Sequence, residues 1–128
     1  MVLAHTKTMF SKLTRHYVRD IKADKIILGE WISDSVLLVM PGGADLPYCH
    51  KLDGVGNNQI KKYVAGGGSY LGICAGAYYA CRNVEFDMGG RLQVYGERHW
   101  RLLIAWRTVQ FTSFIIICFV ELVLKKLF

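Results

Sequence analysis

The sequence predicts an α/β fold, a partial doubly wound parallel sheet followed by an apolar C-terminal helix, on three observations. Two short apolar runs each end in glycines or other small residues. Every glycine lies between Gly29 and Gly96. The stretch from Leu102 to Phe128 is largely apolar and holds neither glycine nor proline. Strands that end in glycine-rich turns and lead into helices are typical of doubly wound sheets, whose sites form at the carboxyl ends of the strands.

The composition limits the chain to one domain of ordinary size. Its 128 residues are 52% apolar and 20% charged, which excludes a disordered or low-complexity segment. Four cysteines are too few for a disulfide scaffold, and none of them form a C-x-x-C pair. The formal net charge of +6 is spread along the chain without a Lys/Arg cluster, so we expect no nucleic-acid partner. The residues also predict no metal and no cofactor.

The N-terminal segment, Met1 to Ile21, is predicted to form one amphipathic helix that packs on a sheet. Its apolar residues recur at helical spacing, at Leu13, Tyr17, Val18 and Ile21. The segment lacks the uninterrupted apolar core of a signal peptide, so secretion is not expected. An Arg-bearing transit peptide is the alternative, and the acidic residues that follow argue against it.

The two strands and two helices of the predicted sheet follow in order. Val36 to Met40 has five consecutive apolar residues, which is typical of a strand covered on both faces. Asn57 to Val64 reads as a short helix that three glycines end. Ser69 to Cys74 is the second strand, and the small residues of Ala75 to Ala80 suit a closely packed helix.

The run Gly72-Ile73-Cys74-Ala75-Gly76 has the form of a nucleophile elbow, in which a nucleophile sits on a tight turn between a strand and a helix. Small residues two positions to either side let the strand and helix approach each other. Cys74 is therefore the candidate nucleophile, activated by the positive end of the helix dipole. The backbone N–H groups of Ala75 and Gly43 are the candidate oxyanion donors. A buried cysteine in a turn of small residues is the alternative interpretation.

A nucleophilic cysteine needs a base, and no histidine stands out for that role. His50 is the one predicted near the strand ends, in the loop after Gly42 and Gly43. His5 and His16 belong to the N-terminal helix, and His99 has no supporting pattern. The sequence therefore predicts no complete Cys-His-acid set.

Several segments together carry a resemblance to a known family. PGGADLPYC runs from Pro41 to Cys49 and GGSYLGICAGAYYA from Gly67 to Ala80, and VEF lies at Val84 to Phe86 with G-x-R at Gly96 to Arg98. These segments resemble the glutamine-amidotransferase-like domain at the N-terminus of eukaryotic biotin-protein ligases. The LPYC extension is not a general amidotransferase feature, so the resemblance is specific. It covers about two thirds of the chain, roughly from Lys12 to Arg98.

The resemblance implies a flavodoxin-like, class I amidotransferase-like sheet that is truncated here. It maps the family's elbow cysteine onto Cys74 and its oxyanion-side glycines onto Gly42 and Gly43. The family's His and Glu partners lie downstream of any matching segment, and Gly89-Gly90-Arg91 is not the Gly-Arg-Gly-Arg loop of the ligase domain. We therefore expect a non-catalytic fragment without ligase activity. The alternative is a Cys74-dependent amidase or glutaminase that acts on a small-molecule amide.

The sequence predicts two regions, an α/β domain at 1–101 and an apolar tail at 102–128. The tail has two possible interpretations. Thr108 to Leu124 is almost long enough for a membrane-spanning helix, with tryptophans before it and Lys125-Lys126 after it as interfacial anchors. The chain would then be a small tail-anchored protein of the endoplasmic-reticulum membrane, and otherwise it is expected in the cytoplasm. The other interpretation is a remnant of a truncated or frame-shifted gene that lies on the open sheet edge as a substitute strand or helix.

Overall fold

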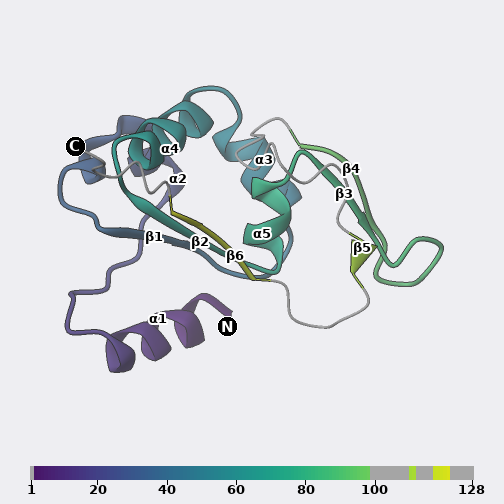
Figure 1. The fold of residues 1–128 in the computed structure, drawn as a ribbon, viewed down its shortest axis with the longest axis horizontal. Helices are drawn as coiled ribbons and strands as arrows, with labels where there is room; N and C mark the ends of the chain where they lie inside the picture. The colour runs from purple at the N-terminus through teal and green to yellow at the C-terminus, as the bar shows by residue number, and fades with distance from the viewer. Residues whose placement is uncertain (1, 99–109, 112–116, 122–128) are drawn as a thin grey trace, which may run out of the picture.

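The computed structural model describes residues 2–98, 110–111 and 117–121 and shows a mixed α/β fold. A three-stranded sheet has four α-helices on one side and α1 on the other, and a second small sheet lies beyond α5 (Figure 1). The predicted mixed α/β class is confirmed, whereas the predicted doubly wound sheet is represented by one parallel strand pair.

The central sheet has the order β1-β2-β6. Strand β1 (Leu37–Met40) pairs in parallel with β2 (Ser69–Ile73), with Leu37 opposite Ser69 and Met40 opposite Gly72. Strand β6 (Ile117–Glu121) runs antiparallel on the other side of β2. The two apolar runs that predicted strands therefore form the parallel pair, and each ends at a glycine-containing turn.

Four helices and a short 3₁₀ helix build the main core against one face of this sheet. They are α2 (Ala23–Leu28), η1 (Glu30–Ile32), α3 (Leu46–Leu52), α4 (Val55–Ala65) and α5 (Ala75–Ala80). Side chains alternate along a strand, so Leu38, Met40 and Tyr70 are the strand residues that are buried under these helices. The predicted helices at 57–64 and 75–80 are confirmed within α4 and as α5.

Helix α1 (Val2–Leu13) lies across the other face of the sheet and has no buried residue (Figure 1). The predicted helix extended to Ile21, and this was wrong beyond Leu13. Tyr17 is 90% exposed, whereas Ile21 packs against the main core. Docking of Ile21 into the core requires a non-helical segment after Leu13, and this tertiary contact overrides the local helical pattern.

A second sheet with the order β4-β3-β5 follows α5. Strands β3 (Asn83–Phe86) and β4 (Val94–Glu97) form an antiparallel hairpin, and β5 (Gln110–Phe111) pairs in parallel with β3. Asp87 closes the hairpin turn by accepting a hydrogen bond from Leu92 N at Oδ2, over 2.9 Å. This sheet shares a small separate core with α5, formed by Ala77, Tyr78, Cys81 and Val84.

The described residues of the tail are strands, so the predicted apolar helix at Thr108 to Leu124 is wrong where the structure describes it. Residues Ile117–Glu121 occupy the open edge of β2, which is the substitute strand of the second interpretation. Strand β6 satisfies the backbone groups of that edge, which a helix in the same place would leave unpaired. Across the described ranges, no helix is long and apolar enough to cross a membrane. Trp100, Trp106, Lys125 and Lys126 lie outside those ranges.

Candidate functional site

Cys74 is the single residue between β2 and α5, and its backbone is strained. Its φ of 52° and ψ of −105° lie in a region that residues other than glycine rarely adopt. Such conformations cost about 1–3 kcal/mol and persist where the surrounding structure enforces them. The side chain is exposed, whereas every residue of α5 is buried. The turn therefore presents the thiol at the carboxyl end of the strand.

Gly72 and Gly76 permit the close packing that enforces this turn. A Cβ atom on Gly72 would lie 2.6 Å from the carbonyl carbon of Gly76, and one on Gly76 would overlap the carbonyl oxygen of Met40. Both contacts are with backbone atoms, which cannot rotate away. Helix α5 is thereby packed directly against β1 and β2, and Tyr70 fixes it by donating a hydrogen bond to Gly76 O over 2.6 Å.

The turn after β1 lies beside Cys74. A Cβ on Gly42 would be 3.4 Å from the Cβ of Cys74 and 3.7 Å from Cγ1 of Val2, so the start of α1 also reaches this point. Gly43 has a φ of 133°, and a Cβ there would contact nothing within 4 Å. The structure thus brings Gly42 against Cys74 and leaves Gly43 beside open space. The assignment of Gly43 and Ala75 as oxyanion donors stays a prediction.

Two tyrosines interact electrostatically with Cys74. Burial raises the pKa of Tyr48, and the nearby Cys74 raises it further. Burial also raises the pKa of Tyr78 to about 12, with smaller contributions from Cys74 and Asp45. Tyr48 donates a hydrogen bond to Pro41 O over 2.9 Å, which holds α3 against the turn after β1. Both phenols therefore remain neutral, hydrogen-bonding groups at physiological pH.

A buried ion pair joins the turn after β1 to the end of β4. Arg98 Nε lies 2.5 Å from Asp45 Oδ2, and the two side chains are 5% and 8% exposed. Arg98 N also donates to Arg82 O over 2.8 Å, which fixes its backbone. Both residues lie in segments that carry the family resemblance, but those segments predict no role for either of them. Their spacing of 53 residues gives no local signal for the pair.

Beside this ion pair lies a second group of polar side chains, on α3, α4 and α5. Burial raises the pKa of the Cys49 thiol, an effect that Arg98 opposes and the carboxylates of Asp45 and Asp53 reinforce. Asn57 donates to Asp53 Oδ1 over 2.7 Å and accepts a hydrogen bond from the buried Tyr79 hydroxyl. These bonds satisfy a buried amide and connect the three helices.

The histidines are not assembled into a triad by any described contact. His50 is exposed on α3 and His16 is exposed after α1. His5 is exposed on α1, one helical turn after Val2, which adjoins Gly42. His99 lies outside the described residues. Within the part of the chain that the structure describes, no group of three or more His, Cys, Asp or Glu side chains is arranged to hold a metal ion.

Comparison with known proteins places the chain in a family. A family model described as "Biotin-protein ligase, N terminal" matches residues 2–114. A "Biotin--protein ligase" of Schizosaccharomyces pombe is 38% identical over 82 residues, which cover 63% of this chain and 13% of that protein. An "Uncharacterized protein" of Chlamydia muridarum is 55% identical over 56 residues, which cover 44% of this chain and 22% of that protein.

The matching segments therefore span less than a quarter of either relative. No solved structure matches the chain. The family model covers all of the residues that form the β1–β2 pair, its helices, the Cys74 turn and the β3–β4 hairpin. This chain belongs to the biotin-protein ligase N-terminal family.

Proposed function

We propose that this chain is a non-catalytic module of the biotin-protein ligase N-terminal type, without ligase activity of its own. The observation that carries the proposal is the family match over residues 2–114. In addition, the segment that matches this chain makes up only 13% of the S. pombe ligase. Gly89-Gly90-Arg91, the segment nearest in composition to a ligase loop, is exposed in the β3–β4 hairpin turn.

An enzymatic assay tests this proposal directly. The purified chain is incubated with biotin, ATP and a biotin-acceptor protein, and transfer is followed with labelled streptavidin. We expect no biotinylated acceptor above the level without the chain, while a complete biotin-protein ligase in parallel labels it. Acceptor labelling that depends on the chain would overturn the proposal.

A second candidate function, thiol-dependent amide hydrolysis, is favoured by the strained and exposed Cys74. In this proposal the turn is a nucleophile elbow of the amidotransferase type, with its strain enforced by the Gly72 and Gly76 contacts. The Cys74 thiolate would attack an amide carbonyl carbon, and the Ala75 and Gly43 N–H groups would stabilise the oxyanion. The C–N bond then breaks, ammonia leaves with a proton, and water hydrolyses the thioester to a carboxylate.

The proton transfers of this second candidate need a base, and we assign that role to His5. Residues three apart on a helix share a face, so His5 follows Val2 along α1, and Val2 adjoins the Gly42 position beside Cys74. His50, the histidine that the sequence placed near the strand ends, is exposed on α3.

Thiol reactivity separates the two candidate functions. Alkylation by iodoacetamide is measured across pH 6–8 at each cysteine by mass spectrometry. A hydrolase requires Cys74 to react at least about tenfold faster than a free thiol at the low end of this range, and His5→Ala to remove that advantage. His16→Ala, an exposed histidine outside α1, is the matched control. Ammonia release from glutamine must also disappear in Cys74→Ser. Ordinary reactivity at Cys74, with no ammonia release, excludes the hydrolase and leaves the non-catalytic module.

A further inference from the structure

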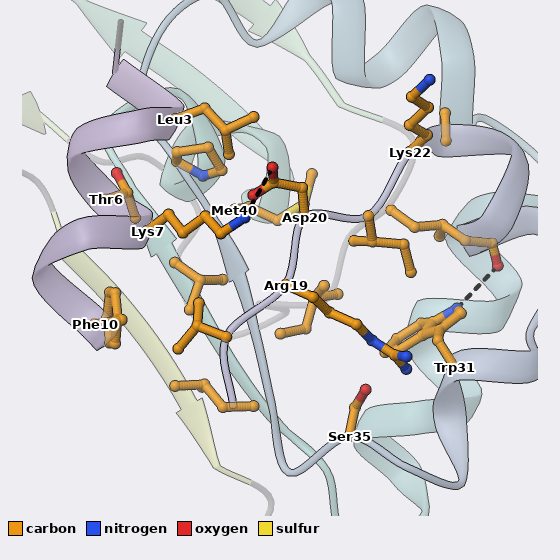
Figure 2. Close-up of a pocket in the computed structure, with 18 of the residues that line it drawn as sticks. Leu3, Thr6, Lys7, Phe10, Arg19, Asp20, Lys22, Trp31, Ser35 and Met40 are labelled. Atoms are coloured by element: carbon orange, nitrogen blue, oxygen red, sulfur yellow. Dashed lines mark hydrogen bonds and ion pairs between the residues drawn. The ribbon is translucent and has the colours of Figure 1, made fainter. Parts of the chain in front are cut away.

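A cavity of about 1050 Å³ lies between α1 and the edge of the central sheet (Figure 2). Its floor is formed by nine consecutive residues, 34 to 42, which include the whole of β1. The segment from 16 to 24 runs along the opposite side, and α1 contributes one wall. Because the whole of β1 lines it, the cavity is elongated along this strand.

The edge of β1 that faces this cavity has no partner strand. Across residues 2–98, 110–111 and 117–121, β1 pairs with β2 alone. Val36 O accepts a hydrogen bond from Ser69 N, so the backbone groups of every second residue from Val36 point toward β2. The N–H and C=O groups of Leu37 and Val39 consequently point away from β2, toward the cavity.

Both walls of the cavity carry large apolar side chains, with Thr6 and Lys7 beside them on α1. Leu3 and Phe10 project from α1 on one side, and Trp31 lies on the other (Figure 2). Ile26 also lines the cavity. A strand placed between these walls would present alternate side chains to each of them. Because both walls carry large apolar side chains, apolar side chains on both faces of such a strand would pack against them.

The rim of the cavity is charged. Lys7 and Asp20 bridge α1 and the following segment, with 3.3 Å between Nζ and Oδ2. Arg19, Lys22 and Lys51 line the same cavity without an ion pair to another described residue, and Asp24 and Asp34 also line it. The three cations outnumber the two carboxylates, and this surplus of positive charge favours an acidic group at the end of an apolar ligand.

We propose that this cavity binds an extended peptide segment of a partner protein, which adds as a strand to the open edge of β1. The segment is apolar over four or five residues and carries acidic residues at its ends. Main-chain hydrogen bonds to Leu37 and Val39 supply affinity, and the two apolar walls select the side chains. A small amphipathic molecule would fill the volume but would leave the row of edge N–H groups without acceptors.

A synthetic peptide tests the proposal on the full chain. The probe is a fluorescein-labelled peptide of four valines flanked by aspartates, and binding is followed by fluorescence anisotropy. We expect saturable binding that weakens at least about tenfold when alternate peptide nitrogens of the probe are methylated. Replacement of the flanking aspartates by lysines is also expected to weaken binding.

Two variants at one position provide the matched comparison. Val39→Pro removes an edge N–H that points into the cavity, whereas Val39→Ala keeps it, and neither removes a hydrogen bond to β2. We expect the proline variant to lose binding and the alanine variant to retain it, with circular dichroism confirming that both are folded.

The methylated probe keeps the test decisive if the proline variant does not fold, because it is used with the unaltered chain. Equal binding of methylated and unmethylated probes would overturn the proposal. Binding of decanoate in the absence of any peptide binding would overturn it equally, since the cavity would then be a site for a small amphipathic anion.

Discussion

At the scale of single residues, Gly76 permits α5 to pack directly against the backbone of β1. Its Cβ position coincides with the backbone of Met40, so Gly76→Ala must separate α5 from β1. We expect it to lower the free energy of unfolding by at least about 3 kcal/mol, at or above the upper end of ordinary overpacking effects. The midpoint of urea denaturation measures this loss.

Gly66→Ala is the control for this substitution, because Gly66 has an ordinary φ of −78° and its closest contact would be 3.3 Å. It is expected to change the midpoint far less. Similar midpoints for the two alanine variants would show that α5 does not depend on backbone contact with β1.

The Asp45–Arg98 pair makes a second prediction at this scale. Removal of one partner leaves the other charge buried and uncompensated, so Asp45→Asn is expected to cost about 3–5 kcal/mol of stability. Combining Asp45→Asn with Arg98→Met should cost less than the sum of the two single changes, and denaturation of all three variants measures the difference.

The exposed Lys7–Asp20 pair is the internal comparison. Its side chains are 42% and 51% exposed, and Lys7→Gln is expected to cost less than about 1 kcal/mol. For the buried pair, a stability loss in the double variant equal to the sum of the losses in Asp45→Asn and Arg98→Met would contradict an energetic coupling between the β3–β4 hairpin and the turn after β1.

The residues of the candidate site differ in how far the sequence could predict them. The strained position of Cys74 follows from local spacing, because Gly72 and Gly76 bracket it by two residues on each side. The partnership of Asp45 with Arg98 has no such local pattern. It depends on where the β3–β4 hairpin packs, which is a tertiary property.

At the scale of elements, the tail shows the limit of pattern reading. A continuous apolar run has no period that separates a helix from a buried strand, and length alone favoured a helix at Thr108 to Leu124. Ile117–Glu121 instead form a strand along the edge of β2, because the backbone groups of that edge need hydrogen-bond partners.

This role of β6 is testable through its backbone. Val120 stands opposite Tyr70 in the antiparallel ladder. Because the backbone groups of Ser69 and Leu71 face β1, those of Tyr70 face β6, so Val120→Pro removes an N–H that faces β2 while Val120→Ala keeps it. We expect the proline variant to expose the edge of β2, lower the urea midpoint and aggregate at concentrations where the alanine variant stays monomeric. Light scattering during concentration measures the difference. Identical behaviour of both variants would mean that β6 does not protect the sheet.

At the scale of the whole molecule, a buried thiol and a buried phenol make the free energy of unfolding decrease at alkaline pH. Burial raises the pKa of Cys81 from 9.0 to about 11 and that of Tyr78 from 10.0 to about 12. Well below pH 9 both groups are protonated in the folded and unfolded states. Between pH 9 and 12 the unfolded chain loses these protons first, so the free energy of unfolding falls as pH rises.

Thermal denaturation from pH 7 to 12 measures this dependence. Tyr78→Phe is expected to flatten the decline above pH 10, and Cys81→Ala the decline that begins near pH 9. Tyr95→Phe, at a residue that is 64% exposed, is the control and should leave the profile unchanged. A profile of the unaltered chain that is flat to pH 12 would contradict the burial of these groups.

The sequence by itself determined the strand–turn–helix segments and the position of Cys74 on its turn, because both depend on neighbours within a few residues. It also determined the family, because the matching segments are recognised by their residues without knowledge of how they pack. The tertiary structure decided the antiparallel third strand, the early end of α1, the Asp45–Arg98 pair and the cavity beside β1. Each of these depends on segments distant in the chain. Their pairing is set by which buried backbone groups, charges and apolar faces still need partners once the local elements have formed.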